Sequence, residues 1–229
     1  MPLKNKIFLV VLYLNLFSIW SARSQGVSFS YLIPKNGYIT APISPFSIRG
    51  IGVGEVLGIE SGFSLYNIPG LAMENLPFSY DKPLTGPHFA LMIPADIYVK
   101  FPIEKMSLKF MIGGFGWWNI GQRINEGNMD RAWRSFEGWE VLNTDFQLKN
   151  KLGYGWLGGF EFQFPFSREV KLSIEANYLR GSSKTMLKGS YSGVKDSNSQ
   201  LITKEVDINN ASTVIEGLEL SFGAIFSMR

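Results

Sequence analysis

The chain has 229 residues, which is enough for one domain with a full core and too few to argue for two. Aromatic residues make up 14% of it and charged residues only 18%, and 24 positions are glycine. This composition is rich in Phe, Trp and Gly and poor in charge for an ordinary soluble domain. The absence of cysteine excludes disulfides, thiol catalysis and cysteine-based zinc sites. We expect no metal site and no cofactor.

The beginning of the chain is typical of a cleaved signal peptide. Lys4 and Lys6 precede an apolar run from Ile7 to Trp20, and Ala22 and Ser24 are small residues at the two positions that a signal peptidase reads. The apolar run is shorter than the roughly 20 residues of a spanning helix, which favours cleavage over a retained anchor. We therefore expect the first 24 residues to be removed.

Cleavage changes the charge of the protein. Lys4, Lys6 and Arg23 are the only charged residues of that segment, so its removal takes away the whole formal charge of +3. The remaining domain, residues 25–229, is near neutral, and we expect no nucleic-acid partner. No later segment is apolar over the length of a membrane helix. An exported chain of this kind can enter a membrane only as a closed barrel, in which every backbone polar group is paired.

The segment from Leu152 to Phe164 shows the pattern that the rest of the chain repeats. Large residues, five of them aromatic, occupy alternate positions, interrupted only by Gly158. The intervening positions hold glycines with Leu157, Glu161 and Gln163. Alternation of this length predicts a β-strand. A soluble sheet covers its wet face with residues such as Lys and Thr, whereas aromatics backed by small residues fit lipid on one side and a narrow lumen on the other.

Similar alternation recurs along the chain, and it is weaker from Trp139 to Lys149. Prolines at 34, 42 and 45 make the segment before Ile51 an edge strand or an extended lead-in, and Asn67 to Pro87 is a predicted loop. We expect Glu55 to mark a strand end or a bulge, and residues 129–136 to form a short helical turn. Eight strands are predicted, and they start at Ile51, His88, Met106, Trp139, Leu152, Val170, Lys184 and Thr213.

Two short turns carry Phe-Pro, at Pro102 and at Pro165, and much longer polar loops separate the other strands. Short turns at one rim and long loops at the other are typical of outer-membrane barrels. If both Phe-Pro turns share a rim, the segments at Trp139 and Lys184 would be loop extensions, and the lead-in from Val27 would have to supply strands. The hydrophilic stretch 182–212 predicts a long hairpin extension that turns near residues 196–199.

With these features the chain resembles small outer-membrane β-barrel proteins of Gram-negative bacteria. The resemblance is sharpest at Leu218–Phe226, where alternate apolar residues end in an aromatic, as in the terminal-strand signal for membrane insertion. The family usually ends on the aromatic itself, whereas three residues follow it here. The resemblance implies an all-β fold, a closed antiparallel up-and-down transmembrane barrel of about eight strands in the cell outer membrane. Its partners would be outer-membrane lipid, the barrel-insertion machinery through the C-terminal strand, and an envelope protein of unknown identity. We expect a monomer.

Two groups of side chains are candidates for function. Charged and polar residues on the glycine-rich faces could act as a hydrolytic acid pair, but a charge-paired, hydrogen-bonded lumen is favoured, because buried polar groups require partners. This predicted lumen network comprises Glu60, Asp96, Lys100, Lys109, Glu161, Gln163, Lys171, Glu175 and Glu219. A loop patch that could bind lipopolysaccharide phosphates or a surface partner comprises Arg123, Arg131, Trp133, Arg134 and Phe136. Residues that suit interfacial girdles are Phe101, Phe164, Tyr178, Trp117 and Trp118.

Several functions remain open from the sequence. We expect a non-catalytic barrel with a structural, adhesive or envelope-complex accessory role. The alternatives are a narrow, porin-like pore or hydrophobic-ligand transport barrel, a barrel-embedded lipid-modifying enzyme and an exported soluble barrel with its aromatic faces inside. An enzyme would have to use His88, the only histidine, and no nucleophile motif surrounds it.

Overall fold

A computed structural model describes residues 24–35, 41–196 and 200–227. The signal peptide that we predict over residues 1–24 falls almost entirely outside them, as does most of the turn expected at 196–199. The described elements are β1 (Ser24–Pro34), β2 (Ala41–Val53), β3 (Leu57–Ile68), β4 (Ala72–Glu74), β5 (His88–Ile103), β6 (Met106–Ile120), α2 (Glu126–Glu137), β7 (Val141–Asn150), β8 (Gly153–Pro165), β9 (Val170–Val194) and β10 (Ile202–Ser227).

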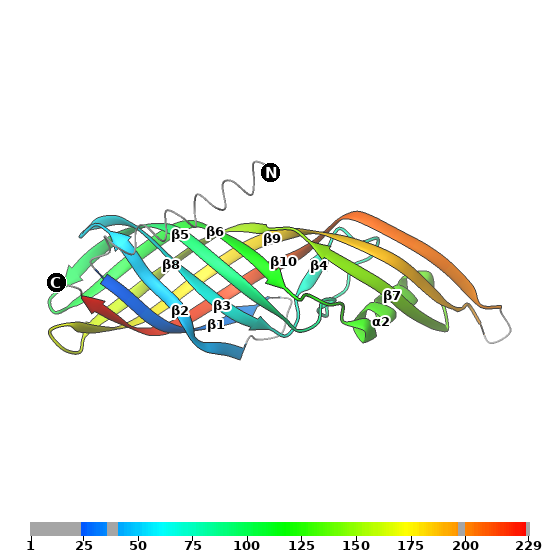
Figure 1. The fold of residues 1–229 in the computed structure, drawn as a ribbon, viewed down its shortest axis with the longest axis horizontal. Helices are drawn as coiled ribbons and strands as arrows, with labels where there is room; N and C mark the ends of the chain where they lie inside the picture. Colours follow the sequence, from blue (N-terminus) through cyan, green and yellow to red (C-terminus); the bar gives the residue numbers. More distant parts are fainter. Residues whose placement is uncertain (1–23, 36–40, 197–199, 228–229) are drawn as a thin grey trace.

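Eight of the strands close into a barrel (Figure 1). The order around the ring is β1-β2-β3-β5-β6-β8-β9-β10, every neighbour is antiparallel, and β10 pairs with both β9 and β1. Ring order follows chain order once the short β4 and the outlying β7 are set aside. This confirms the predicted fold class, a closed antiparallel up-and-down barrel, and the pairing of β1 with β10 closes the ring, whereas β1 and β2 pair only over Gly26–Ser28.

Two of the eight predicted segments, those from Trp139 and Lys184, are not separate strands of the ring. The segment from Trp139 contains β7, which pairs only with the outer part of β9, and Lys184 lies inside β9. β1 and β2 take their places in the ring, as the alternative based on the Phe-Pro turns requires. The prolines are tolerated because Pro34 ends β1 and the register of β2 shifts between Pro42 and Ser47, where no regular ladder hydrogen bond is needed.

The two rims of the barrel differ as predicted. Residues 104–105 and 166–169, which follow the two Phe-Pro sequences, form short turns at the same rim. Glu55 lies in a third short turn, between β2 and β3, so the predicted strand from Ile51 is in fact a hairpin. Ser24 pairs with Ser227, which places both ends of the described barrel at this short-turn rim. The long connections 69–87 and 121–152 lie at the opposite, long-loop rim (Figure 1).

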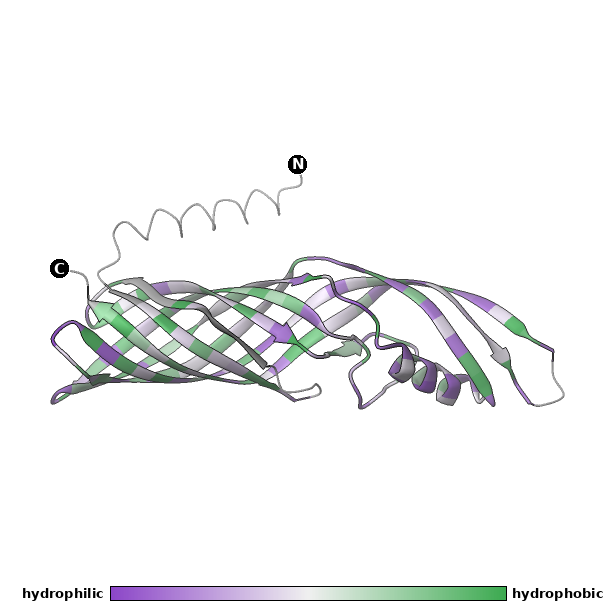
Figure 2. Cartoon of the chain, turned by 60° about the horizontal axis from the view of Figure 1, so that its bottom comes forward, coloured by the Kyte–Doolittle hydropathy of each residue, from purple (hydrophilic) through white to green (hydrophobic). Residues whose placement is uncertain are grey.

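β9 and β10 continue past the long-loop rim and form an extension, defined here as residues 121–150 and 186–210. β7 pairs with the outer part of β9 to give a three-stranded sheet, and α2 packs against it. Hydrophilic residues are frequent in this part of the chain, whereas apolar residues recur along the barrel strands (Figure 2). The predicted hairpin extension is therefore present, and it is joined by a helix.

The helix begins and ends at recognisable caps. The side chain of Asn125 accepts a hydrogen bond from the backbone N–H of Asn128 at 3.2 Å, which satisfies one of the free donors of the first turn. Gly138 adopts the left-handed conformation (φ 67°), and its N–H donates to Arg134 O at 2.9 Å. The twelve residues of α2 exceed the short turn expected from the sequence. It is not long and apolar enough to cross a membrane, and neither is any other helix of the described residues.

Candidate functional site

The outward side chains of the barrel are mostly large and apolar. In the register of neighbouring strands Phe29 faces Phe222, Phe222 faces Ile174 and Ile174 faces Phe162, and all four are substantially exposed. On β8 the outward apolar residues extend over about ten residue steps. At roughly 3.3 Å per step and a strand tilt of about 40°, that band is about 25 Å high, the height of the apolar belt of outer-membrane barrels.

The half of the lumen nearer the short-turn rim is built around Lys109. Its Nζ donates to both carboxylate oxygens of Glu60, at 2.8 and 2.7 Å, and forms an ion pair with Glu161. The three side chains are only 6%, 11% and 4% exposed. Buried charges are stable only when they are paired and hydrogen-bonded, and here one ammonium serves two carboxylates.

Hydrogen bonds extend this arrangement toward the rim. Gln163 Nε2 donates to Glu161 at 3.0 Å, and Lys100 Nζ donates to Gln163 Oε1 at 2.8 Å. Lys171 lies half-buried on the lumen side of β9, and Asp96 is buried on β5. Seven of the nine residues of the predicted network thus lie in this half of the lumen.

A second group lies further along the same lumen. Asn177 is fully buried and donates to Glu219 at 3.0 Å and also to Glu175. Tyr66 OH donates to the other oxygen of Glu219. Tyr66 was outside the predicted network, because the sequence alone does not show which strands meet across the lumen.

A row of hydrogen-bonded serine hydroxyls in the lumen was also not predicted from the sequence. Ser221 and Ser30 are 2.7 Å apart, Ser30 and Ser47 are 3.1 Å apart, and Ser47 donates to Ser64 at 2.7 Å. The row crosses β10, β1, β2 and β3. In the sequence, Ser28 and Ser30 alternate with Val27, Phe29 and Tyr31, which indicates a strand with serine on its inner face. The prolines that follow led us to expect a lead-in there instead of a strand of the ring.

The lumen is not polar throughout, which corrects the prediction of a polar interior. Between the network and the long-loop rim it is filled by a layer of apolar side chains. Trp117, assigned to an interfacial girdle from the sequence, is 1% exposed in this layer, whereas its neighbour Trp118 is 52% exposed on the outside. Adjacent strand residues must face opposite sides, so both could not be girdle residues. The layer comprises Leu32, Tyr66, Ile68, Leu71, Ala90, Met92, Phe115, Trp117, Leu157, Leu179 and Ile215.

Among the described residues, the side chains around Lys109 leave little open space in the lumen. A cavity of about 10 Å³ lies beside Lys109, lined also by Ser28, Ser173 and Glu175. This volume holds about one water molecule. The apolar layer above it separates the cavity from the long-loop rim. An eight-stranded ring is expected to be filled in this way, because its interior is only wide enough for side chains.

His88 is held in a structural arrangement at the long-loop rim. It is buried, with Nδ1 2.9 Å from Gly86 O and Nε2 3.1 Å from Asn119 Oδ1. Asn119 in turn donates to Gln122, and Gln122 donates to Thr213 at 3.2 Å. Both described partners of the imidazole are thus a carbonyl and an amide oxygen, and neither is a nucleophile.

The predicted loop patch is divided by the fold. Arg123, Arg131, Arg134 and Phe136 are exposed, but Trp133 is only 4% exposed and does not belong to a surface patch. Its ring packs 4.8 Å from that of Tyr191 and 5.2 Å from that of Phe78. The helical period of α2 turns Trp133 toward the sheet, and the short helical turn predicted over residues 129–136 did not show which surface it would meet.

Trp133 belongs to a second hydrophobic core, outside the barrel, between α2 and the extension sheet. Its buried members are Met73, Leu84, Met129, Ala132, Trp133, Trp139, Leu142, Leu187, Tyr191 and Ala211.

A polar contact also joins α2 to the sheet. Glu137 accepts hydrogen bonds from Lys204 Nζ at 2.9 Å and from Tyr191 OH. Partial burial acts to raise the pKa of Glu137, but these two hydrogen bonds outweigh it and hold that pKa below its ordinary value. The hydrogen bond to Glu137 likewise raises the pKa of Lys204.

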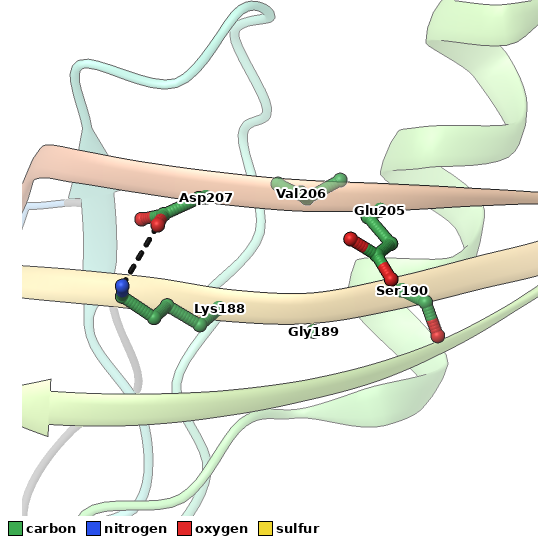
Figure 3. A pocket seen from close by; sticks show the side chains of 6 residues that line it. All are labelled: Lys188, Gly189, Ser190, Glu205, Val206 and Asp207. Atoms are coloured by element: carbon green, nitrogen blue, oxygen red, sulfur yellow. Dashed lines mark hydrogen bonds and ion pairs between the residues drawn. The ribbon is translucent and has the colours of Figure 1, made fainter.

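The opposite face of the extension sheet is open and polar (Figure 3). Lys188 Nζ lies 2.7 Å from Asp207, beside Ser190 and Glu205, and these residues line a hollow of about 500 Å³. The described part of the chain holds no group of three or more His, Cys, Asp or Glu that could bind a metal ion.

The closed ring of eight antiparallel strands, the apolar exterior and the filled lumen define a small transmembrane β-barrel of the outer-membrane type. No protein-family model matches the chain, and no curated protein matches it.

Similar solved structures are outer-membrane proteins. They include a major outer membrane protein from Thermus thermophilus, with 10% identity, 89% of this chain and 98% of that chain covered and a TM-score of 0.46. The outer membrane protein OprG from Pseudomonas aeruginosa has 11% identity, covers 88% and 96%, and has a TM-score of 0.45. Outer Membrane Protein W from E. coli has 10% identity, covers 90% and 98%, and has a TM-score of 0.40. Because these identities and TM-scores are low, the assignment to this class is based on the strand pairing and on the apolar outer surface of the barrel.

Proposed function

We propose that the protein is an integral barrel of the bacterial outer membrane, exported by its N-terminal signal peptide, that anchors a folded extension outside the bilayer. Its role would be structural, adhesive or accessory to an envelope complex. The observation that carries this proposal is the second hydrophobic core, which lies beyond the barrel and joins α2 to the three-stranded sheet.

A connection that only closes a barrel needs no core of its own. Here Trp133, Trp139 and Tyr191 pack ring against ring, and Leu187 is fully buried beneath them. Packing of this kind orders a segment that would otherwise be among the least stable of a barrel. An ordered, polar surface beyond the long-loop rim is suited to contact with another macromolecule. The long-loop rim is the outer side in proteins of this class, so the extension would face away from the cell.

We also propose that the protein does not catalyse a reaction. The buried carboxylates that could form an acid pair are bound by Lys109, Asn177 and Tyr66, and His88 contacts a carbonyl and an amide. These contacts satisfy the polar groups of a filled interior. If the protein were a lipid-modifying enzyme that depends on its histidine, His88→Ala would change the lipid A profile of the host, and we expect no such change.

The test separates the anchor from the extension. In one variant the β9–β10 hairpin is cut back to the paired residues Thr185 and Ala211, joined by Asn-Gly, and residues 122–150 are replaced by a short Gly/Ser link. Every pair of the barrel ring is retained. We expect this variant to remain in the membrane after a carbonate wash and to show heat-modifiable migration, as the full chain does.

Surface cross-linking in cells then compares the variant with the full chain. We expect the full chain to cross-link to an envelope or surface partner and the variant to lose that product. An identical cross-linking pattern would contradict the role of the extension. Steady ion conductance of the full chain in planar bilayers would instead support a pore, and extraction without detergent would contradict membrane insertion altogether.

A further inference from the structure

The outer surface of the barrel changes from apolar to basic along β9. Its outward residues are Ile174 and Tyr178 within the apolar band, followed by Arg180 and Ser182 at the border of the band, where they pair with Trp156 and Tyr154 of β8, and by Lys184 beyond it. All of these are exposed, and the side chain of Arg180 is 59% exposed. The change from hydrocarbon-compatible to cationic side chains therefore takes place between one outward position of the strand and the next.

β7 adds a third cation to the same surface. β8 is the neighbour of β9 as far as the pair Tyr154 and Ser182, and β7 then takes over on that side, with Lys149 opposite Met186. Lys149 is exposed and outward-facing. It is diagonal to Lys184 across the two strands, a separation of about 7–8 Å between such positions in an antiparallel pair.

The positive charge of this cluster is largely uncompensated. Within the described part of the chain neither Lys149 nor Lys184 forms an ion pair. Arg180 lies 3.5 Å from Glu216, but that carboxylate also binds Lys35 at 3.2 Å and accepts from Tyr178 OH at 2.7 Å. One carboxylate shared in this way cannot neutralise three cations.

The cluster is confined to one level and one sector of the barrel. Further from the membrane on the same face, Lys188 is neutralised by Asp207 and followed by Glu205 (Figure 3). Further around the ring, past β8, the outward residues of β6 and β5 at this rim include Trp118 and Phe89, which carry no charge. Uncompensated cations thus lie directly against the apolar band.

Aromatic rings mark this border. Trp156 is paired with Arg180, is half exposed, and lies 5.7 Å from the ring of Tyr178. Tyr154, at the pair next to Lys184, is also half exposed. Tyr and Trp are enriched at the level of lipid headgroups, where an amphipathic ring meets both phases.

We propose that Lys149, Arg180 and Lys184 form a binding site for the phosphate groups of a phosphorylated, lipid A-type glycolipid in the leaflet at the long-loop rim. Trp156 and Tyr154 pack against the same lipid. This inference rests on the proposed membrane location. It places phosphate binding on β7 and β9, whereas the sequence pattern suggests Arg123, Arg131 and Arg134, on and beside α2, for that role. Arginine supplies paired donors to phosphate and the lysines supply point charges. Basic residues next to an anionic lipid surface contribute roughly equally and additively.

The test uses the full chain in mixed micelles and follows bound lipid by native mass spectrometry. The probes are bisphosphorylated lipid A, the same lipid without its phosphates, and phosphatidylglycerol as an anionic phospholipid. The variant Lys149→Gln/Arg180→Gln/Lys184→Gln removes the site. The control variant Lys105→Gln/Arg168→Gln/Lys195→Gln removes the same charge from exposed positions elsewhere.

We expect the wild type and the control to bind bisphosphorylated lipid A about tenfold or more tightly than the site variant, with no difference for the phosphate-free lipid. Equal loss in both variants, or no preference of the wild type for phosphate, would overturn the site. Equal competition by phosphatidylglycerol at matched phosphate would overturn the choice of a glycolipid. Heat-modifiable migration is recorded in parallel, so that failure of the barrel to insert is distinguished from failure of the site.

Discussion

Replacing Lys109 by methionine tests the lumen network most sharply. The substitution keeps an unbranched apolar stem of four atoms and removes the ammonium, which leaves the buried carboxylates of Glu60 and Glu161 without their shared cation. Charged hydrogen bonds contribute about 1.5–3 kcal/mol each, and removing one partner of a buried ion pair costs about 3–5 kcal/mol. We therefore expect Lys109→Met to lower the free energy of unfolding by about 3–5 kcal/mol.

A urea titration in micelles, followed by heat-modifiable migration and far-UV circular dichroism, measures this loss. Lys171→Met is the matched control, because Lys171 lies half-buried at the rim with no ion pair within the described residues, and we expect a cost below about 1 kcal/mol. Combining Lys109→Met with Glu60→Gln and Glu161→Gln removes the stranded charges, and most of the stability should return. A single-variant loss below about 1 kcal/mol, or a triple variant no more stable than the single one, would refute the reasoning.

Three further outcomes are expected. Gly155→Ala should destabilise the barrel by about 1–3 kcal/mol, because its Cβ would meet Phe115 and the backbone of β9 within the lumen, whereas Gly158→Ala on the outer face should be nearly neutral, as urea titration will show. Trp133→Ala should cost the extension about 3–5 kcal/mol and expose it to limited proteolysis while the barrel stays intact. The contact between Glu137 and Lys204 stabilises the extension between their pKa values. It is lost as acidification protonates Glu137 below its lowered pKa and as strong alkali deprotonates Lys204, which hydrogen exchange of α2 will measure.

These outcomes have their own controls. Phe136→Ala truncates an exposed ring of the same helix, so it should leave protease resistance nearly unchanged, and equal sensitivity of both variants would contradict a buried role for Trp133. Equal effects of alanine at the two glycines would contradict the assignment of inner and outer faces. Glu137→Gln should abolish the acid-dependent change in exchange, and its persistence would place the responsible group elsewhere.

The strands were predictable where one chemical rule governs each face. β8 shows this best: Trp156, Phe160 and Phe162 point outward, while Glu161 and Gln163 point into the lumen. Lipid on one side and a narrow lumen on the other allow few residue types at each position, so the alternation is long and easily recognised in the sequence.

The alternation of side chains did not predict the structure where proline, glycine or contacts between distant segments also determined the sequence. Proline concealed β1 and β2, although register shifts and strand ends accommodate it. Repeated glycines near Trp117 erased the alternation that would have placed this ring inside. Trp133 was unpredictable for another reason, because the surface that buries it is created by strands distant in the sequence. Partners across the lumen, such as Tyr66 and Glu219, likewise depend on ring order and shear.

The central claim is that lipid, and not water or a protein core, covers the outward face of β8. Because the chain has no cysteine, single cysteines at 156, 158, 160 and 162 can carry a nitroxide label in reconstituted vesicles without further changes. Power-saturation spectra in oxygen and in a water-soluble nickel complex measure which phase each label meets. We predict high oxygen and low nickel accessibility at all four positions, and the ratio of oxygen to nickel accessibility should be greatest near the middle of the band. High nickel accessibility at these positions, or low accessibility to both reagents, would contradict the claim.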